Sequence, residues 1–233
     1  MSALKKKLPR LLTPTLRNKI MTARKSEFSE DFRDQLDLLM RLRRDVRRFR
    51  NTPVDETVLT RCLDAIRLAP SVGLSEPWRI LRINSETSRA AALQNFEAAN
   101  AQALAGYSGE NAKTYSQLKL TGMQDAPVQL AIYCDDSTTK GRGLGAGTMP
   151  EMRRYSVVTA ITLFWLALRA EGLGLGWVSI LDPEQLNRDL NVPDDWQLIG
   201  YFCLGHPEET SETPELEQKG WEARQDRLKI ETR

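Results

Sequence analysis

The chain has 233 residues, of which 41% are hydrophobic and 27% charged, and its formal net charge is +2. A chain of this length and composition can bury a real core, so a fibrous or disordered protein is excluded. No apolar run approaches the roughly 20 residues that a membrane span needs, and we expect no membrane association. The single histidine excludes zinc and iron sites that use several histidines, so no metal is expected.

The amino-terminal segment, residues 1–26, carries Lys and Arg without an acidic residue and lacks a continuous apolar stretch. It is typical of a flexible basic arm rather than a secretory signal. We expect a single domain over residues 27–233. Three widely spaced cysteines without paired spacing indicate free buried thiols, and therefore a cytoplasmic protein. They are Cys62, Cys134 and Cys203.

The first half of this domain is predicted to be mainly helical. An apolar stripe predicts a helix over Phe28–Leu42, after which the chain is extended and Phe49 is expected to be buried. A second helix is capped by Asp55 and ends before Pro70. A strand follows around Ile80–Ile83, and then a long polar helical region over 86–119.

The second half alternates buried strands and helices. The run "APVQLAIYCDD" is typical of a buried strand, and a glycine-rich loop follows it. "RRYSVVTAITLFWLALRAEG" is apolar on nearly every face and predicts a helix through the centre of the fold. "LGWVSIL" is a predicted strand, Asp182 and Pro183 begin a short helix, and "QLIGYFCLGHP" is the last strand.

The alternating glycines of "EGLGLGWVSI" do not form a dinucleotide-binding fingerprint. That fingerprint requires a strand, then glycines, then a helix, whereas the order here is helix, glycines, strand. Gly172 is therefore expected to cap the helix in a left-handed conformation. Gly174 and Gly176 are expected to let the strand pass close to something flat or bulky, with a plain helix-to-strand turn as the alternative.

Two further segments are candidates for ligand binding. "RRDVRRF" offers Arg43, Arg44 and Arg47, whose guanidinium groups suit a terminal phosphate, and Asp45 lies among them. That aspartate and the near-neutral net charge argue against a nucleic-acid surface. "APSVGLSEPWRI" places hydroxyls and exposed amides, including Ser71 and Gly73, in a rigid loop between prolines that can cradle a polar cofactor.

Together, these segments resemble one known family. "RRDVRRF", "APSVGLSEPWRI", "LKLTGMQDAPVQLAIYCDD", "YSVVTAITLFWLALRAEGLGLGWVSIL" and "PELEQKGWEAR" occur in the order found in the 5,6-dimethylbenzimidazole synthase branch of the flavin-dependent nitroreductase superfamily. The resemblance implies an α+β fold with a central mixed, mainly antiparallel sheet flanked by helices. It also implies a homodimer with exchanged terminal segments and FMN at the dimer interface.

The resemblance also implies roles for individual residues. The expected FMN-binding residues are Arg43, Arg44, Val46 and Arg47 on the phosphate and ribityl side, Ser71, Val72 and Gly73 at the ring edge, and Trp177 and Val178 beside the ring. The aspartate of "RRDVR" and the serine of "GWVSI", hallmarks of the synthase branch, are the expected catalytic residues Asp45 and Ser179.

The implied reaction consumes reduced FMN as a substrate. With O2, the ring system is fragmented to 5,6-dimethylbenzimidazole, the lower ligand of vitamin B12, and erythrose 4-phosphate. We expect Ser179 to hydrogen-bond near flavin N5 and Asp45 to accept a proton near ribityl C1′. Its neighbouring arginines should keep Asp45 ionised. No NAD(P)H-binding element is visible, so a separate flavin reductase is expected to supply reduced FMN.

Two other functions are compatible with the same residues. An NAD(P)H-dependent FMN nitroreductase would keep FMN as a cycling cofactor. A nucleic-acid or membrane-surface module would rely on the basic arm and would bind without flavin.

Overall fold

The computed structural model describes residues 27–118 and 121–233. The chain divides into two units, Met1–Met40 and Arg41–Arg233. In the first unit, Ser29 Oγ accepts a hydrogen bond from the amide of Phe32 (3.2 Å) at the start of helix α2, Glu30–Leu42. The predicted first helix is therefore confirmed, with a start two residues later. The arm predicted for residues 1–26 lies outside the described residues, and a single domain over 27–233 stays a prediction.

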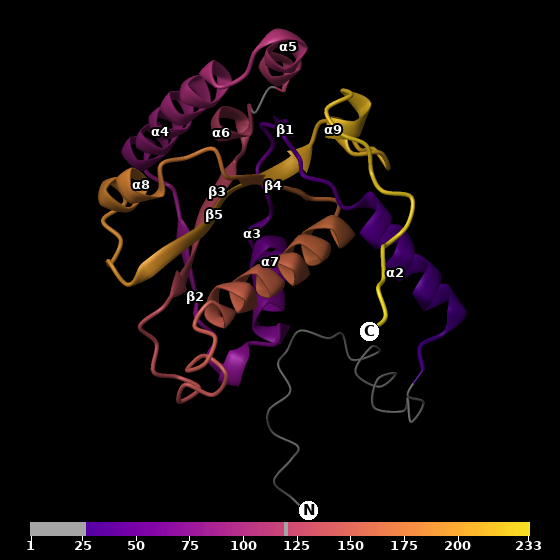
Figure 1. Cartoon of the computed structure of the whole chain (residues 1–233), viewed down its shortest axis with the longest axis vertical. Coiled ribbons are helices and arrows are strands. Elements are labelled where there is room, and N and C mark those ends of the chain that lie inside the picture. Colours follow the sequence, from indigo (N-terminus) through magenta and orange to yellow (C-terminus); the bar gives the residue numbers. More distant parts are fainter. Residues whose placement is uncertain (1–26, 119–120) are drawn as a thin grey trace, which may run out of the picture. The chain divides into compact units, whose positions relative to one another are not determined.

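The second unit is built on an antiparallel sheet, which in its described residues has the order β1-β5-β3-β2, with β4 also paired to β5. The strands are β1 Phe49–Arg50, β2 Trp78–Arg82, β3 Val128–Asp135, β4 Gly174–Val178 and β5 Trp196–Pro207. Parallel pairing occurs at an isolated bridge between Asp45 and Leu175. The predicted α+β class with a mainly antiparallel sheet is confirmed (Figure 1).

The helices over 56–63, 152–170 and 183–189 lie where the sequence predicts them, whereas the helical region predicted over 86–119 is interrupted at 106–108 and the short helices over 72–74, 122–125 and 215–218 were not predicted. The helices of this unit are α3 Glu56–Leu63, η1 Asp64–Leu68, η2 Val72–Leu74, α4 Glu86–Ala105, α5 Gly109–Gln117, α6 Gly122–Asp125, α7 Met152–Ala170, α8 Pro183–Asp189 and α9 Glu215–Gln218. The cap Asp55 accepts hydrogen bonds from the amides of Thr57 and Val58, at 2.7 and 3.1 Å. Asp182 caps α8 in the same way, through the amide of Gln185 at 3.0 Å.

Two hydrophobic cores cover the two faces of the sheet. Alternate residues of β3 point to opposite faces, as a strand requires: Leu130 and Ile132 pack with α3, η1 and α7, while Ala131 and Tyr133 pack with α4, α6 and α8. In Figure 1, α7 runs along one face of the sheet, and α4 and α8 lie together on the other. Every residue of β3 is buried, which confirms the predicted buried strand.

Helix α7 differs from the sequence prediction on one side. Its inner face is buried, with Phe164 and Leu168 fully enclosed, but Tyr155 is 53% exposed and Val158 is also exposed. The helix therefore covers the sheet rather than running through a core that surrounds it. The three cysteines are free and buried, as predicted. Among the described residues, none of the helices is long and apolar enough to cross a membrane.

Candidate active site

The segment from Arg43 to Arg48 is held in an extended conformation alongside β4. The amide of Val46 donates to the carbonyl of Leu175 (3.0 Å), and the amide of Gly122 donates to the carbonyl of Arg47 (2.9 Å). Phe49, 2% exposed, then anchors the segment in the core, as the sequence predicts. In an extended chain neighbouring side chains point to opposite sides, so Arg44 and Val46 face one way and Asp45 the other.

The glycines of β4 lie against another segment of the chain. A Cβ on Gly176 would lie 2.1 Å from the backbone oxygen of Val46, and one on Gly174 would lie 2.7 Å from Val46 Cγ2. These glycines therefore admit the chain's own arginine-rich segment, and the bulky neighbour expected beside the strand is Val46. Gly172 has φ +76°, and its left-handed cap is confirmed.

Asp45 is fixed by the strand beside it. Its Oδ1 accepts a hydrogen bond from the backbone amide of Trp177 (2.8 Å), and 41% of its side chain remains exposed. Desolvation by the surrounding protein raises the pKa of Asp45, and the Trp177 amide, Arg47 and Arg43 oppose this only in part. The sequence led us to expect that the arginines would dominate, whereas desolvation outweighs them. A raised pKa makes Asp45 a stronger base when it is ionised.

Arg47 lies between two carboxylates. Its Nε is 3.9 Å from Asp45 Oδ2 and also 3.9 Å from Glu215 Oε2 in α9. Glu215 Oε1 accepts a hydrogen bond from Arg48 Nη1 at 3.1 Å. Residues from the two ends of the second unit therefore meet at this point.

Arg43 and Arg44 form the cationic side of the site. The guanidinium of Arg43 lies over the Trp165 ring, 4.7 Å from its centroid, and the Trp165 indole donates to the Arg44 carbonyl (3.2 Å). Burial, together with the charge of Arg224, lowers the pKa of Arg44. Its Nε is buried and has no hydrogen-bond partner within the described residues. A buried, unpaired guanidinium N–H is a site at which an anion would be stabilised.

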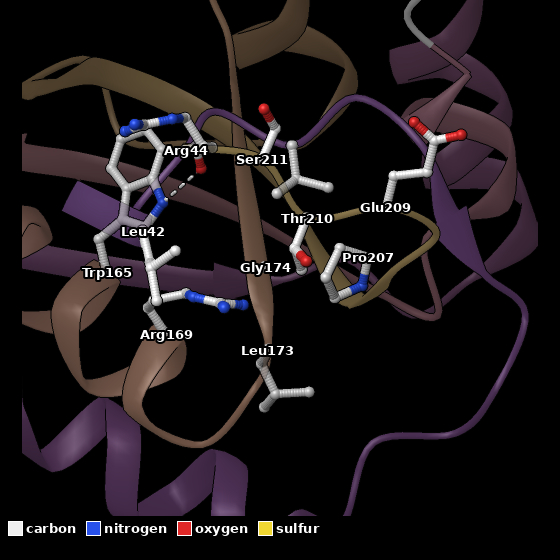
Figure 2. A pocket seen from close by; sticks show the side chains of 11 residues that line it. Leu42, Arg44, Trp165, Arg169, Leu173, Gly174, Pro207, Glu209, Thr210 and Ser211 are labelled. Carbon is white, nitrogen blue, oxygen red and sulfur yellow. Dashed lines mark hydrogen bonds between the residues drawn. The ribbon is translucent and has the colours of Figure 1, made fainter. Parts of the chain in front are cut away.

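A shallow pocket lies beside Arg44. Figure 2 shows the dashed hydrogen bond from Trp165 to the Arg44 carbonyl, with Arg169, Thr210 and Ser211 around the same space. Asp45 does not line this pocket. It lines a neighbouring pocket with Arg47 and Glu215, and Arg44, Val46 and Ser211 line both pockets.

The loop containing Ser71, Val72 and Gly73 lies elsewhere on the molecule. The amide of Val72 donates to Ser156 Oγ (3.0 Å) in the first turns of α7. Gly73 has φ +58°, and a Cβ there would lie 2.9 Å from two backbone oxygens of the glycine-rich loop. Ser156 and Trp165 are separated by roughly 13 Å of helix axis. The loop and the arginine-rich segment therefore contact α7 at well separated points.

The remaining predicted residues lie at the end of β4. Trp177 and Val178 line a small inner pocket together with Asp45. Ser179 follows the strand, is exposed, and has no hydrogen bond to another described residue. Ser179 is two residues beyond the amide that binds Asp45, so it lies roughly 7 Å further along the chain direction.

Sequence reasoning missed three residues of the site. Trp165 lies beneath Arg43, Glu215 lies against Arg47, and Cys203 lines the inner pocket with Asp45. Of these, Trp165 and Glu215 are in the segments "YSVVTAITLFWLALRAEGLGLGWVSIL" and "PELEQKGWEAR", which the resemblance singled out without giving either residue a role. In the part of the chain that the structure describes, His, Cys, Asp and Glu form no cluster that could hold a metal ion.

The chain is similar to known proteins over most of its length. A family model described as "Nitroreductase family" matches residues 40–206. A 5,6-dimethylbenzimidazole synthase of Rhodospirillum rubrum is 49% identical over 197 residues, covering 84% of this chain and 93% of the relative. A protein of the same name from Rhodobacter capsulatus is 46% identical, covering 84% and 94%.

A solved structure supports the fold. Oxidized iodotyrosine deiodinase bound to FMN and 3-iodo-L-tyrosine superposes with a TM-score of 0.66 at 21% identity, covering 85% of this chain and 97% of that one. At this identity the likeness concerns the fold alone.

Proposed function

Because this chain belongs to the nitroreductase family, we propose that it is a 5,6-dimethylbenzimidazole synthase that fragments reduced FMN with O2. The observation that carries the proposal is the pair of relatives of that name, 49% and 46% identical over nearly their whole length. The geometry supports it, because the aspartate expected in the synthase branch is held in place beside arginines with an unpaired N–H. The products are 5,6-dimethylbenzimidazole and erythrose 4-phosphate.

The residues present fit a phosphorylated flavin. Arg43, Arg44 and Arg47 would hold its phosphate and ribityl side, and the unpaired Nε of Arg44 offers a hydrogen bond that a phosphate oxygen can accept. Trp177 and Val178 would lie beside the ring. FMN supplies the ring system that becomes product and the electrons that reduce O2.

The ring-edge loop Ser71–Gly73 would come from a second copy of the chain, with the loop and the arginines meeting α7 at separate points. An exposed apolar face near this loop supports a homodimer. It includes Tyr155 and Val158 of α7 and Leu74 of η2, with Leu144 and Met149 exposed in the neighbouring loop. Exchange of terminal segments between the two copies is part of the same proposal.

Asp45 and Ser179 are the two side chains of the protein that would take part in the reaction. Asp45 accepts a proton at ribityl C1′, and its raised pKa strengthens it for that role. Ser179 donates a hydrogen bond in the N5 region of the ring, since its hydroxyl is exposed and free of other described partners. Reduced FMN comes from a separate NAD(P)H-dependent flavin reductase.

The proposal is tested by mixing the protein anaerobically with chemically reduced FMN, admitting air, and measuring 5,6-dimethylbenzimidazole by mass spectrometry. The wild-type protein should form it. Asp45→Asn should abolish it while FMN binding stays within a few-fold, because Asn keeps an oxygen that accepts the Trp177 hydrogen bond. Asp64→Asn, which removes the same charge from a surface pair with Arg67, is the matched control and should behave as wild type.

Two results would contradict the proposal. Product from Asp45→Asn at the wild-type rate would remove Asp45 from the chemistry. A purified yellow protein that oxidises NAD(P)H while its FMN stays intact would instead support the nitroreductase alternative.

A further inference from the structure

Glu215 is a largely buried carboxylate, 17% exposed, that the proposed chemistry does not use. It begins α9 and faces two arginines of the segment that carries Asp45, 3.1 Å from Arg48 Nη1 and 3.9 Å from Arg47 Nε. The hydrogen bond to Arg48 fixes the Glu215 carboxylate, which attracts Arg47 across the longer distance. The position of Glu215 is therefore well defined relative to Arg47.

Arg47 is shared between Glu215 and Asp45. Its Nε is equally far, 3.9 Å, from the nearest oxygen of each, and its side chain is only 11% exposed. A distance of 3.9 Å is longer than a hydrogen bond, so Arg47 attracts Asp45 without binding it directly. Within the described residues, Asp45 Oδ2 therefore has no cationic group at hydrogen-bonding distance.

We propose that Glu215 is a positioning residue that holds Arg47 back from Asp45 and so keeps Asp45 able to accept a proton. The inference rests on the proposed function, in which Asp45 is the proton acceptor. A guanidinium that closed onto Asp45 in a hydrogen-bonded pair would stabilise its charged form and weaken it as a base. Glu215 prevents this by competing for the same guanidinium.

The charged and titratable groups around Asp45 agree with this role. Desolvation raises the pKa of Asp45, Arg47 and Arg43 lower it in part, and Glu215 adds to the rise. Cys203 of β5 also faces Asp45, and burial, followed by the charge of Asp45, raises the pKa of its thiol to about 12. That thiol is neutral at pH 7 and carries no charge that acts on Asp45. Glu215 is therefore the acidic neighbour whose charge a substitution can remove.

The test is a titration of the Asp45 carboxyl carbon by 13C NMR in the full-length protein, with the Asp45→Asn spectrum identifying its signal. In Glu215→Gln, Asp45 should titrate at lower pH than in wild type. Glu215→Asp should lie between the two, because it keeps the charge one methylene further from Arg47. Glu208→Gln is the matched control, since Glu208 pairs with Arg48 (4.0 Å), and should titrate as wild type.

The rate of product formation gives a second readout. In Glu215→Gln the acid limb of the pH profile should move to lower pH, and the plateau rate should fall by about threefold because the base is weaker. If Glu215 had a purely structural role, Glu215→Gln would lower the rate at every pH and leave the acid limb at the same pH.

An unchanged Asp45 titration in Glu215→Gln would overturn the inference. If that variant does not fold, an unchanged titration in Glu215→Asp would do the same. If the titration moves as expected but no protein forms product, the synthase proposal fails and the positioning role of Glu215 stands.

Discussion

Gly176→Ala tests how the site is assembled. The added Cβ would lie 2.1 Å from the backbone oxygen of Val46, which is a backbone atom that cannot turn aside as a side chain can. The segment from Arg43 to Arg47 must therefore move away from β4. Two hydrogen bonds are lost when it moves, from Val46 N to the Leu175 carbonyl (3.0 Å) and from Trp177 N to Asp45 (2.8 Å).

The neutral bond contributes about 0.5–1.5 kcal/mol and the one to a carboxylate about 1.5–3 kcal/mol, so the free energy of unfolding should fall by about 2–4.5 kcal/mol. For a protein of this size the melting temperature should fall by roughly 5–15 °C. FMN affinity should fall at least about tenfold, because one lost charge-assisted contact already has that effect. Thermal unfolding and a fluorescence titration with FMN measure the two effects.

Gly172→Ala is the comparison for Gly176→Ala, because it adds backbone strain without a steric clash. A Cβ there meets nothing within 4 Å, but φ is +76°. The strain should cost only about 1 kcal/mol and leave FMN binding unchanged. If Gly176→Ala melts no lower than Gly172→Ala and binds FMN as wild type does, the packing of β4 against Val46 is not what builds the site.

Two other predictions concern charge. Arg43→Ala should weaken FMN binding about 10- to 100-fold through a lost charge-assisted bond, and riboflavin binding much less, in fluorescence titrations; equal losses for both would place Arg43 away from the phosphate. Asp45→Asn should melt at a higher temperature than wild type at pH 7. Because folding raises the pKa of Asp45, its ionisation costs stability as pH rises, and the gain should vanish as pH falls towards the unfolded value of about 3.9. A difference in melting temperature between Asp45→Asn and wild type that stays constant from pH 7 to pH 4 would contradict the raised pKa of Asp45.

The local features of the fold could be predicted from the sequence. Asp55 and Asp182 cap helices because each precedes an apolar-periodic segment, and the side chain of such a residue reaches the free amides of the first turn. The run around Ile132 is buried on both faces, as its lack of polar residues indicates. Gly172 caps α7, since only glycine adopts φ +76° without strain.

Features that depend on distant parts of the chain could not be predicted in this way. Glu215 meets Arg48 across 167 positions of sequence, and no local pattern indicates that pairing. The glycines of β4 signalled a close approach correctly, but the sequence did not show that Val46 is the group that approaches. The exposed side of α7 was missed because an apolar face looks the same whether a core or a second copy covers it.

The fate of the flavin tests the central claim most directly. The protein is mixed anaerobically with a known amount of reduced FMN, air is admitted, and both the FMN that remains and the 5,6-dimethylbenzimidazole that forms are quantified. Loss of FMN matched mole for mole by 5,6-dimethylbenzimidazole is the predicted result. Full recovery of oxidised FMN without that product would contradict the account.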